Sequence, residues 1–548
     1  MSDVYNTQKP LYSIAQDYFD YLGSHLPLQC ANDEFYFIPR SRTAIQHLNK
    51  LDDLSPDTVQ GHLTHVKRLL REVAHVNAHD LEEEIDCVLL TQSMESFVRE
   101  FEEDMIWSRD PTLYLKIPLF ATDLFISQSD LPSDQRKEYL FSLLEQIPSF
   151  LDRGIQNLIS PTEISIQVAS DMVQDAHHFY NQELRLFTSE NIGDERGFSM
   201  KINNVVEACE RFGTDLSRLP SLKSPARGEE GLKRILSVSL RYHKSPDEIL
   251  EIAQDSYRET QEKLMELAKK LDNRKAWIDI VYEQLPSVSS HTEIMELYTK
   301  EVQDLRRFFS SRDIIPLPSE ETLAVIQTPI YLQSLRATAS YRAPLTGDPR
   351  SLGIFYITPG KDDLELISAH CPYLTAHETY PGHHILDHFR IHNHNPIRSQ
   401  IESPLFYEGW ACYAEHLLDE CGYIQEPRTQ LIQLKRQLWR NLRAILDVKI
   451  HTRKITLMSA AREIEGLGFS SQRAHRQVRR FALTPGYQLC YSMGTYEILE
   501  LRQRFSPAMG LKQFHDILLT GGEAPFHLIE KRLEAWKNKT IENRTNAS

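Results

Sequence analysis

The sequence predicts a mainly α-helical protein that contains one small β-sheet. Apolar residues recur at three- and four-residue spacings, the period of amphipathic helices, in four segments: 51–70, 139–151, 246–271 and 292–309. Two short runs of β-branched and aromatic residues, ETLAVIQTP and SLGIFYITPG, close on Pro or Gly as strands do. Between them lies YRAPLTGDPR, a turn-rich loop. We therefore expect a sheet at about residues 320–360 and helices elsewhere.

Two helical regions are predicted, joined by one irregular segment. In the first, LSPDTVQGHL is a helix start, with Ser55 as N-cap and Pro56 at the first helical position. Residues 216–234 are rich in Pro, Ser, Gly and charge, which favours a boundary or a long surface loop. We expect an N-terminal helical region at 1–220 and a second one at 235–548 that holds the sheet. Together they are expected to form one continuous structural unit.

Composition excludes several classes of function. The net charge of −16 argues against nucleic-acid binding, which needs a basic surface. The seven cysteines are scattered and form no CxxC pair. We therefore expect no disulfide framework, and we expect a reducing compartment. Neither a secretory signal nor a run of 18 apolar residues is evident. These observations predict a cytoplasmic protein without membrane or nucleic-acid partners, and they leave a homodimer open.

An interrupted zinc-protease motif lies near residue 380. In HExxH helices, two histidines four residues apart share one face and bind zinc, and the glutamate beside the first faces the open position. His377 and Glu378 open such a motif, but Pro381 occupies the place of the second histidine and cannot bind a metal. His383 and His384 follow two and three residues later.

Two geometries restore a second ligand. If Pro381 and Gly382 form a bulge in the helix, His383 takes the place one turn after His377. If the helix continues through a proline kink, His384 lies two turns on, on the His377 face. Because Pro followed by Gly readily interrupts a helix, we favour the bulge and keep His384 as the alternative.

A third ligand is expected from the next helix. Glu408 in LFYEGWACYAEHLL follows His377 by 31 residues, which allows a helix, a turn and a return. Gly409 beside it permits a close approach of another helix. Glu415 lies on the same helix face and could orient a ligand from behind. The competing interpretation is a solvated, histidine-rich surface helix without metal.

Four motifs in order resemble the bacterial family known as domain of unknown function 885. HETYPGHH and FYEGWACYAEHL are followed by RAILDVKIH and by TPGYQLCYSMGTYEILELR. YRAPLTGDPRSLGIFYI is similar to the family's YxxP loop and strand, and the whole resemblance spans about 320–505. The family reads DTGIH where this chain has DVKIH, so the turn there departs from the pattern.

The resemblance implies a gluzincin-like metallopeptidase. The expected fold is an elongated helical bundle with a deep channel and a small sheet beside the zinc helix. One Zn²⁺ ion would be bound by three residues of this chain: His377, His383 and Glu408. Glu378 would be the general base that takes a proton from water and delivers it to the leaving amine.

Further roles are assigned with their structural alternatives. His451 and Tyr491 are candidates to stabilise the oxyanion, although Tyr491 suits a core aromatic equally well. Asp447 precedes His451 by one helical turn and could fix its tautomer, or the two could form an ordinary surface pair.

Three features are candidates for substrate contact. The strand expected at 352–357 could pair its edge with an extended peptide, or it could simply be buried. Arg440 and Arg443 could bind a substrate carboxylate, or they could be solvated.

The sequence therefore predicts a zinc-dependent hydrolase of peptide or amide bonds. Carboxypeptidase or dipeptidase action on short peptides is expected from the resemblance. One alternative is a catalytically inactive helical scaffold or binding protein, which the proline at position 381 leaves open. Another is a metal-dependent amide hydrolase in a biosynthetic pathway.

Overall fold

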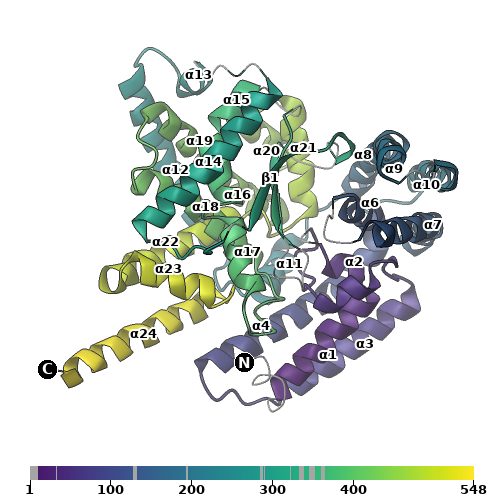
Figure 1. Cartoon of the computed structure of the whole chain (residues 1–548), viewed down its shortest axis with the longest axis horizontal. Helices are drawn as coiled ribbons and strands as arrows, with labels where there is room; N and C mark the ends of the chain where they lie inside the picture. Colours follow the sequence, from purple (N-terminus) through teal and green to yellow (C-terminus); the bar gives the residue numbers. More distant parts are fainter. Residues whose placement is uncertain are drawn as a thin grey trace.

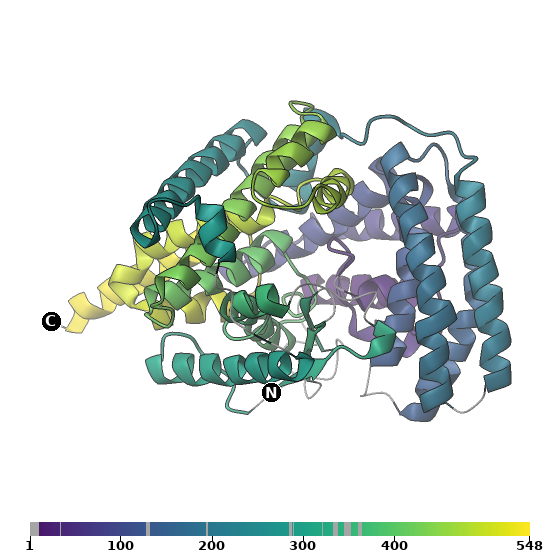
Figure 2. The ribbon, with the colours of Figure 1, turned by 90° about the horizontal axis from the view of Figure 1, so that it is seen from above.

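Helices make up most of the chain, as predicted, and they surround one small sheet (Figure 1). The computed structural model describes the following residues: 10–32, 34–127, 132–192, 195–283, 288, 290–320, 322–332, 338–344, 352–359 and 364–547. Seen from above, the helices between residues 111 and 216 (blue) pack side by side at one end, away from the yellow C-terminal helices (Figure 2).

The described residues of the N-terminal region form the α-helices α1 Pro10–His25, α2 Pro27–Cys30, α3 Pro56–Val73, α4 Leu81–Val98, α5 Ile106–Arg109, α6 Pro111–Ser127, α7 Ser133–Asn157, α8 Glu163–His178, α9 Leu184–Asn191 and α10 Glu195–Leu216. Helices α11 to α16 are α11 Gly228–Arg234, α12 Pro246–Leu271, α13 Trp277–Tyr282, α14 His291–Arg312, α15 Leu364–Ala369 and α16 Cys371–Glu378. The remaining α-helices are α17 His383–Ile391, α18 Pro404–Glu420, α19 Pro427–His451, α20 Leu457–Glu465, α21 Ser471–Leu483, α22 Cys490–Met509, α23 Leu511–Thr520 and α24 Phe526–Ala547. Short 3₁₀ or π segments are η1 Arg42–His47, η2 Arg99–Glu103, η3 Phe179–Glu183, η4 Ile235–Ser239 and η5 Ile330–Leu332.

The predicted helices are present. α3 begins at Pro56 with Ser55 at the N-cap, and α7, α12 and α14 cover the other three periodic segments. The irregular segment is shorter than predicted, because only residues 217–227 separate α10 from α11. One apolar core includes side chains from Leu11 to Leu533, so both helical regions contribute to it.

The sheet has three strands in the order β1-β3-β2: β1 Leu323–Gln327, β2 Ala339–Arg342 and β3 Gly353–Ile357. β3 is parallel to β1 and antiparallel to β2, with Phe355 opposite Val325 and Tyr341. The sequence predicted β1 and β3 but placed Tyr341 in a loop, since β2 is only four residues long. Most of that predicted loop, residues 345–350, lies outside the described residues.

Helices α18 and α22 touch backbone to backbone. A Cβ on Gly409 of α18 would lie 2.6 Å from Cα of Gly494 on α22, so neither position has room for a side chain. The close approach of a second helix that we predicted from Gly409 is therefore confirmed. It holds α22 directly against the segment that carries Glu408.

Substituting Gly494→Ala should therefore destabilise the protein by about 2–3 kcal/mol, because overpacking forces the two helices apart. The new Cβ would lie 2.0 Å from the carbonyl oxygen of Leu405. Urea denaturation measures the loss. Gly61→Ala is the matched control, since nothing lies within 4 Å of its Cβ position on α3 and a gain of about 0.5–1 kcal/mol is expected. Equal stability of the two variants would contradict the packing argument.

Candidate metal centre

The interrupted motif forms two helices rather than one. α16 ends at Glu378, a turn containing the cis Tyr380–Pro381 bond follows, and α17 begins at His383. The predicted two-residue bulge in a continuing helix is therefore wrong in form. Only glycine fits at position 382, because a Cβ there would lie 1.9 Å from the carbonyl oxygen of His377. The turn folds the start of α17 back against the end of α16.

The three predicted ligands converge. Nε2 of His377 and Nε2 of His383 each lie 3.7 Å from Oε2 of Glu408. All three side chains are buried, and their ligand atoms lie within 4.8 Å of one another. Oε2 of Glu408 has no hydrogen-bond donor among the described residues. Since zinc ligands at about 2.0–2.2 Å in a tetrahedron lie about 3.3 Å apart, this cluster is close enough to bind a metal.

The other histidine of the pair faces away from the cluster. Nε2 of His384 lies 3.1 Å from Oγ1 of Thr322, and its Nδ1 lies 3.4 Å from the Tyr341 hydroxyl. His384 therefore attaches α17 to the region of the sheet. Of the two geometries the sequence left open, the structure places His383 with the other ligands.

Glu415 supports the first ligand, as predicted from its helix face. Its Oε1 lies 3.0 Å from Nδ1 of His377, which leaves Nε2 of that ring directed at the cluster. Burial by itself raises the pKa of Glu415, but the guanidinium groups of Arg436 and Arg440 hold it well below its ordinary value. Glu415 is therefore a carboxylate and accepts from Nδ1–H.

Two tyrosines that the sequence did not single out hold the other ligands. The Tyr487 hydroxyl donates to Oε1 of Glu408 at 2.5 Å. Tyr407 stacks on the His383 ring with centroids 4.1 Å apart, and its hydroxyl donates to Asp387. The available signal was their place in the motifs, since Tyr407 directly precedes Glu408 and Tyr487 follows the Pro-Gly pair of TPGY.

Glu378 lies beside the cluster, on the wall of a cavity of about 430 Å³ that also contains the three ligands. Its Oε2 accepts a hydrogen bond from the backbone N–H of Tyr341 at 3.2 Å. Burial, with a further contribution from Glu408, raises the pKa of Glu378 to about 7. Such a carboxyl group can exchange protons near neutral pH.

Both helical regions build this cavity. Its lining includes Tyr36, Arg40 and Asp123 from the first region, together with β2 and residues of α18, α21 and α22 from the second. The predicted role of strand 352–357 as a free edge is wrong, because β3 is central and paired on both sides. β2 is the edge strand at the cavity, and its Tyr341 N–H points at Glu378.

The predicted pair Asp447 and His451 lies outside the cavity lining. Both are fully buried, and Nε2 of His451 lies 3.0 Å from the carbonyl oxygen of Phe481. Oxyanion stabilisation by His451 is therefore wrong. Asp447 accepts from the backbone N–H groups of Gly486 and Leu489, both at 3.1 Å, and so fixes the turn that carries Tyr487.

Tyr491 does line the cavity, close to Glu408. The two arginines considered for substrate binding are already engaged. Arg440 bonds Glu415, while Arg443 bonds Gln488 and lies 3.6 Å from the centre of the Tyr491 ring. We therefore withdraw both as substrate-binding groups.

Asp447→Ala should cost about 3 kcal/mol of stability, because it leaves two buried N–H groups without an acceptor. Displacement of Tyr487 should also weaken metal binding. Asp447→Asn is the control. Burial raises the pKa of Asp447 to about 7, so a neutral side chain that keeps one acceptor oxygen should cost less. Thermal unfolding with and without added zinc measures both effects, and an unchanged Ala variant would contradict the assigned role.

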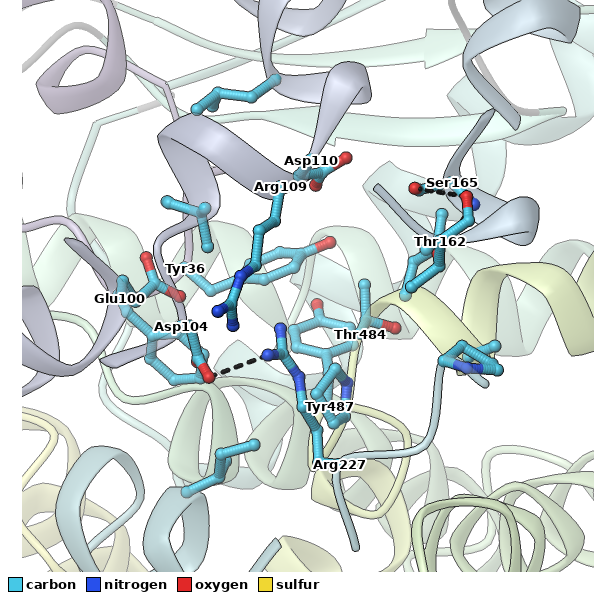
Figure 3. A pocket seen from close by; sticks show the side chains of 18 of the residues that line it. Tyr36, Glu100, Asp104, Arg109, Asp110, Thr162, Ser165, Arg227, Thr484 and Tyr487 are labelled. Atoms are coloured by element: carbon cyan, nitrogen blue, oxygen red, sulfur yellow. Dashed lines mark hydrogen bonds and ion pairs between the residues drawn. The ribbon is translucent and has the colours of Figure 1, made fainter. Parts of the chain in front are cut away.

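A second cavity of about 360 Å³ adjoins the first. The stacked rings of Tyr36 and Tyr487, with centroids 4.0 Å apart, belong to the walls of both. Figure 3 shows this second cavity, with the side chains of Arg109 and Arg227 reaching into it and Arg227 paired with Asp104. The tyrosine pair therefore divides the two spaces.

The fold and site together define a helical protein with a buried His-His-Glu cluster at one cavity. The chain belongs to the DUF885 family, described as "Bacterial protein of unknown function", whose profile matches residues 39–533. That match extends well beyond the 320–505 segment of the motifs. The chain matches no curated protein.

Two solved structures share the fold. A "putative lipoprotein" from Colwellia psychrerythraea superposes with a TM-score of 0.79 at 16% identity, over 97% of this chain and 100% of that chain. A "putative lipoprotein of unknown function" from Shewanella oneidensis gives a TM-score of 0.75 at 20% identity, over 95% and 99% of the two chains.

These two names contradict the prediction of a cytoplasmic location. A lipoprotein is anchored to a membrane by an attached lipid, so these names indicate a location outside the cytoplasm. We therefore withdraw the predicted cytoplasmic location. No helix in the described part of the chain is both long and apolar enough to cross a bilayer.

Proposed function

We propose that this protein is a zinc-dependent hydrolase of peptide or amide bonds that acts on short peptides as a carboxypeptidase or dipeptidase. The observation that carries the proposal is the convergence of His377, His383 and Glu408 beside Glu378 in one cavity. The arrangement agrees with the gluzincin-like site that the motifs imply. Two histidines and a glutamate are also a known catalytic zinc set, which leaves a fourth position open.

The donor set fits one zinc ion. Imidazole nitrogen and carboxylate oxygen are ordinary zinc ligands, and Oε2 of Glu408 is a buried oxygen without a hydrogen-bond donor among the described residues. Glu415 and Tyr487 orient two of the three ligands from behind. When bound, zinc would polarise a carbonyl group and lower the pKa of water to about 7.

The chain's own residues would supply the proton transfers. Glu378 accepts the proton of the attacking water at its carboxylate and then delivers it to the nitrogen of the leaving amine. Tyr491 lies near enough to Glu408 to donate its hydroxyl proton toward a charge that develops on the substrate oxygen. As the edge strand at the cavity, β2 would align an extended peptide along it.

The test is zinc analysis of the purified protein combined with a screen of short peptides and non-peptide amides. We expect one zinc per chain, loss of activity on chelation and recovery on adding zinc. A chain that binds no zinc and gains no activity from it would be the helical scaffold instead. Turnover of non-peptide amides alone would favour the biosynthetic hydrolase.

A further inference from the structure

Among the described residues, Arg480 in the metal cavity has no carboxylate within ion-pair range. Arg480 on α21 lines the cavity together with His377, Glu378 and Glu408, and the residue is exposed. Among the residues that the structure describes, no carboxylate lies within the 4.0 Å of an ion pair with its guanidinium. By contrast, Arg40 in the same cavity is paired with Glu402 at 3.3 Å.

Tyrosines surround this guanidinium. Its electrostatic neighbours are the hydroxyl groups of Tyr36, Tyr491 and Tyr487 and the carboxylate of Glu34, which does not form an ion pair with it. A carboxylate accepts hydrogen bonds from the N–H groups of arginine and from the O–H group of tyrosine. Arginine can bind it through two parallel hydrogen bonds. Among the described residues, the cluster thus offers a guanidinium with no carboxylate in ion-pair range, beside the hydroxyl groups of Tyr36 and Tyr491; the Tyr487 hydroxyl already donates to Glu408.

The position of Arg480 and its tyrosines relative to the metal ligands indicates how a peptide would lie in the cavity. Tyr487 contacts the metal ligand Glu408 and also stacks on Tyr36, the ring pair that separates the metal cavity from its neighbour. Arg480 therefore lies where the cavity meets this dividing pair. A peptide whose end reached Arg480 would place its last peptide bond toward the ligand cluster and Glu378.

We propose that Arg480 binds the C-terminal carboxylate of the peptide substrate and so makes the enzyme a carboxypeptidase. This inference rests on the proposed hydrolase function. The reaction consumes one water, breaks the last peptide bond and releases the C-terminal amino acid with the shortened peptide. Arg480 takes no part in bond cleavage, so it is a specificity-determining residue.

The experiment compares N-acetyl-trialanine with its C-terminal amide as substrates of the zinc-loaded protein. Wild type should prefer the free acid by about 10- to 100-fold in kcat/KM, the range of a hydrogen-bonded charge. Arg480→Met should raise KM for the acid by that factor and leave the amide unchanged. Arg480→Lys should restore part of the preference, since it restores the charge without the paired geometry.

Arg479→Met is the matched control. Arg479 neighbours Arg480 on α21, but its guanidinium bonds Asp171 at 3.0 Å outside the cavity, so its loss should leave the preference intact. Arg342→Met on β2 tests the other arginine of the cavity wall that could take this role. Loss of the preference in Arg342→Met but not in Arg480→Met would overturn the inference.

The outcome is separable from that of the proposed function. Equal hydrolysis of acid and amide by wild type would overturn the role of Arg480 while the hydrolase stands. If no peptide is hydrolysed, calorimetry of the same two peptides on wild type and Arg480→Met decides. Tighter binding of the acid that disappears in Arg480→Met would support the inference, and equal binding of acid and amide would overturn it.

Discussion

Replacing His383 by alanine should remove zinc from the protein, and replacing His384 should not. His383 directs Nε2 at Oε2 of Glu408 from 3.7 Å, whereas His384 contacts Thr322 and the Tyr341 hydroxyl. Loss of a residue that only supports a ligand costs about 10- to 100-fold in metal affinity, and loss of a ligand should exceed that. Atomic absorption after dialysis should find about one zinc per chain for His384→Ala and nearly none for His383→Ala.

The two variants control for each other. They remove neighbouring imidazoles of α17 that are both buried, so a general loss of structure would affect both. His384→Ala should lower stability modestly through its lost contact with Thr322. Retention of zinc by His383→Ala, or its loss from His384→Ala alone, would contradict the ligand set.

The convergence of His377, His383 and Glu408 could be predicted from the sequence because most of its parts are local. Seven residues contain His377, the interrupting Pro-Gly pair and His383. Glu408 follows on the next helix, 31 residues after His377. What the sequence did not determine is the form of the interruption. A bulge and a complete break are compatible with the same sequence. The break is seen in the helix bounds, and the tight return of the chain in the lack of room for a Cβ on Gly382.

The misassigned residues share a different cause. Asp447 and His451 have the spacing of a catalytic pair, but helical spacing does not say which way a buried face points. Their partners, Phe481 and the turn at 486–489, approach from about 30 to 40 residues away. The same limit applies to the strands, since β2 is too short to signal itself and its edge position depends on pairing with β3.

The sequence also did not predict which residues from distant parts of the chain line the cavity. Tyr36 comes from the first helical region and stacks on Tyr487 some 450 residues later, and Arg480 meets both only in the folded chain. Tyr487 itself carries a weak signal, because it follows Pro-Gly within a motif. Arg480 carries no signal in the sequence, because five residues of α21 are arginine or histidine and nothing distinguishes Arg480 from the others.

Glu378→Gln should abolish hydrolysis without removing zinc. The amide keeps an oxygen that can accept the backbone N–H of Tyr341, so the cavity wall should stay in place. What it lacks is the ability to take a proton, the role that we propose for Glu378, whose pKa burial raises to about 7. General-base catalysis contributes about 10²- to 10⁴-fold, and kcat should fall by that factor with KM and zinc content unchanged.

Glu365→Gln provides the control, because that glutamate is exposed on α15 and does not line the metal cavity. Its kcat should equal that of wild type. Steady-state kinetics on one short peptide, with zinc measured in each preparation, distinguishes the two possible causes of a loss. A Glu378→Gln variant that lost zinc would make Glu378 a structural support of the ligands. A variant that kept both zinc and full activity would require another proton acceptor, and within the cavity the remaining carboxylates outside the ligand set are Glu34, Asp123 and Glu402.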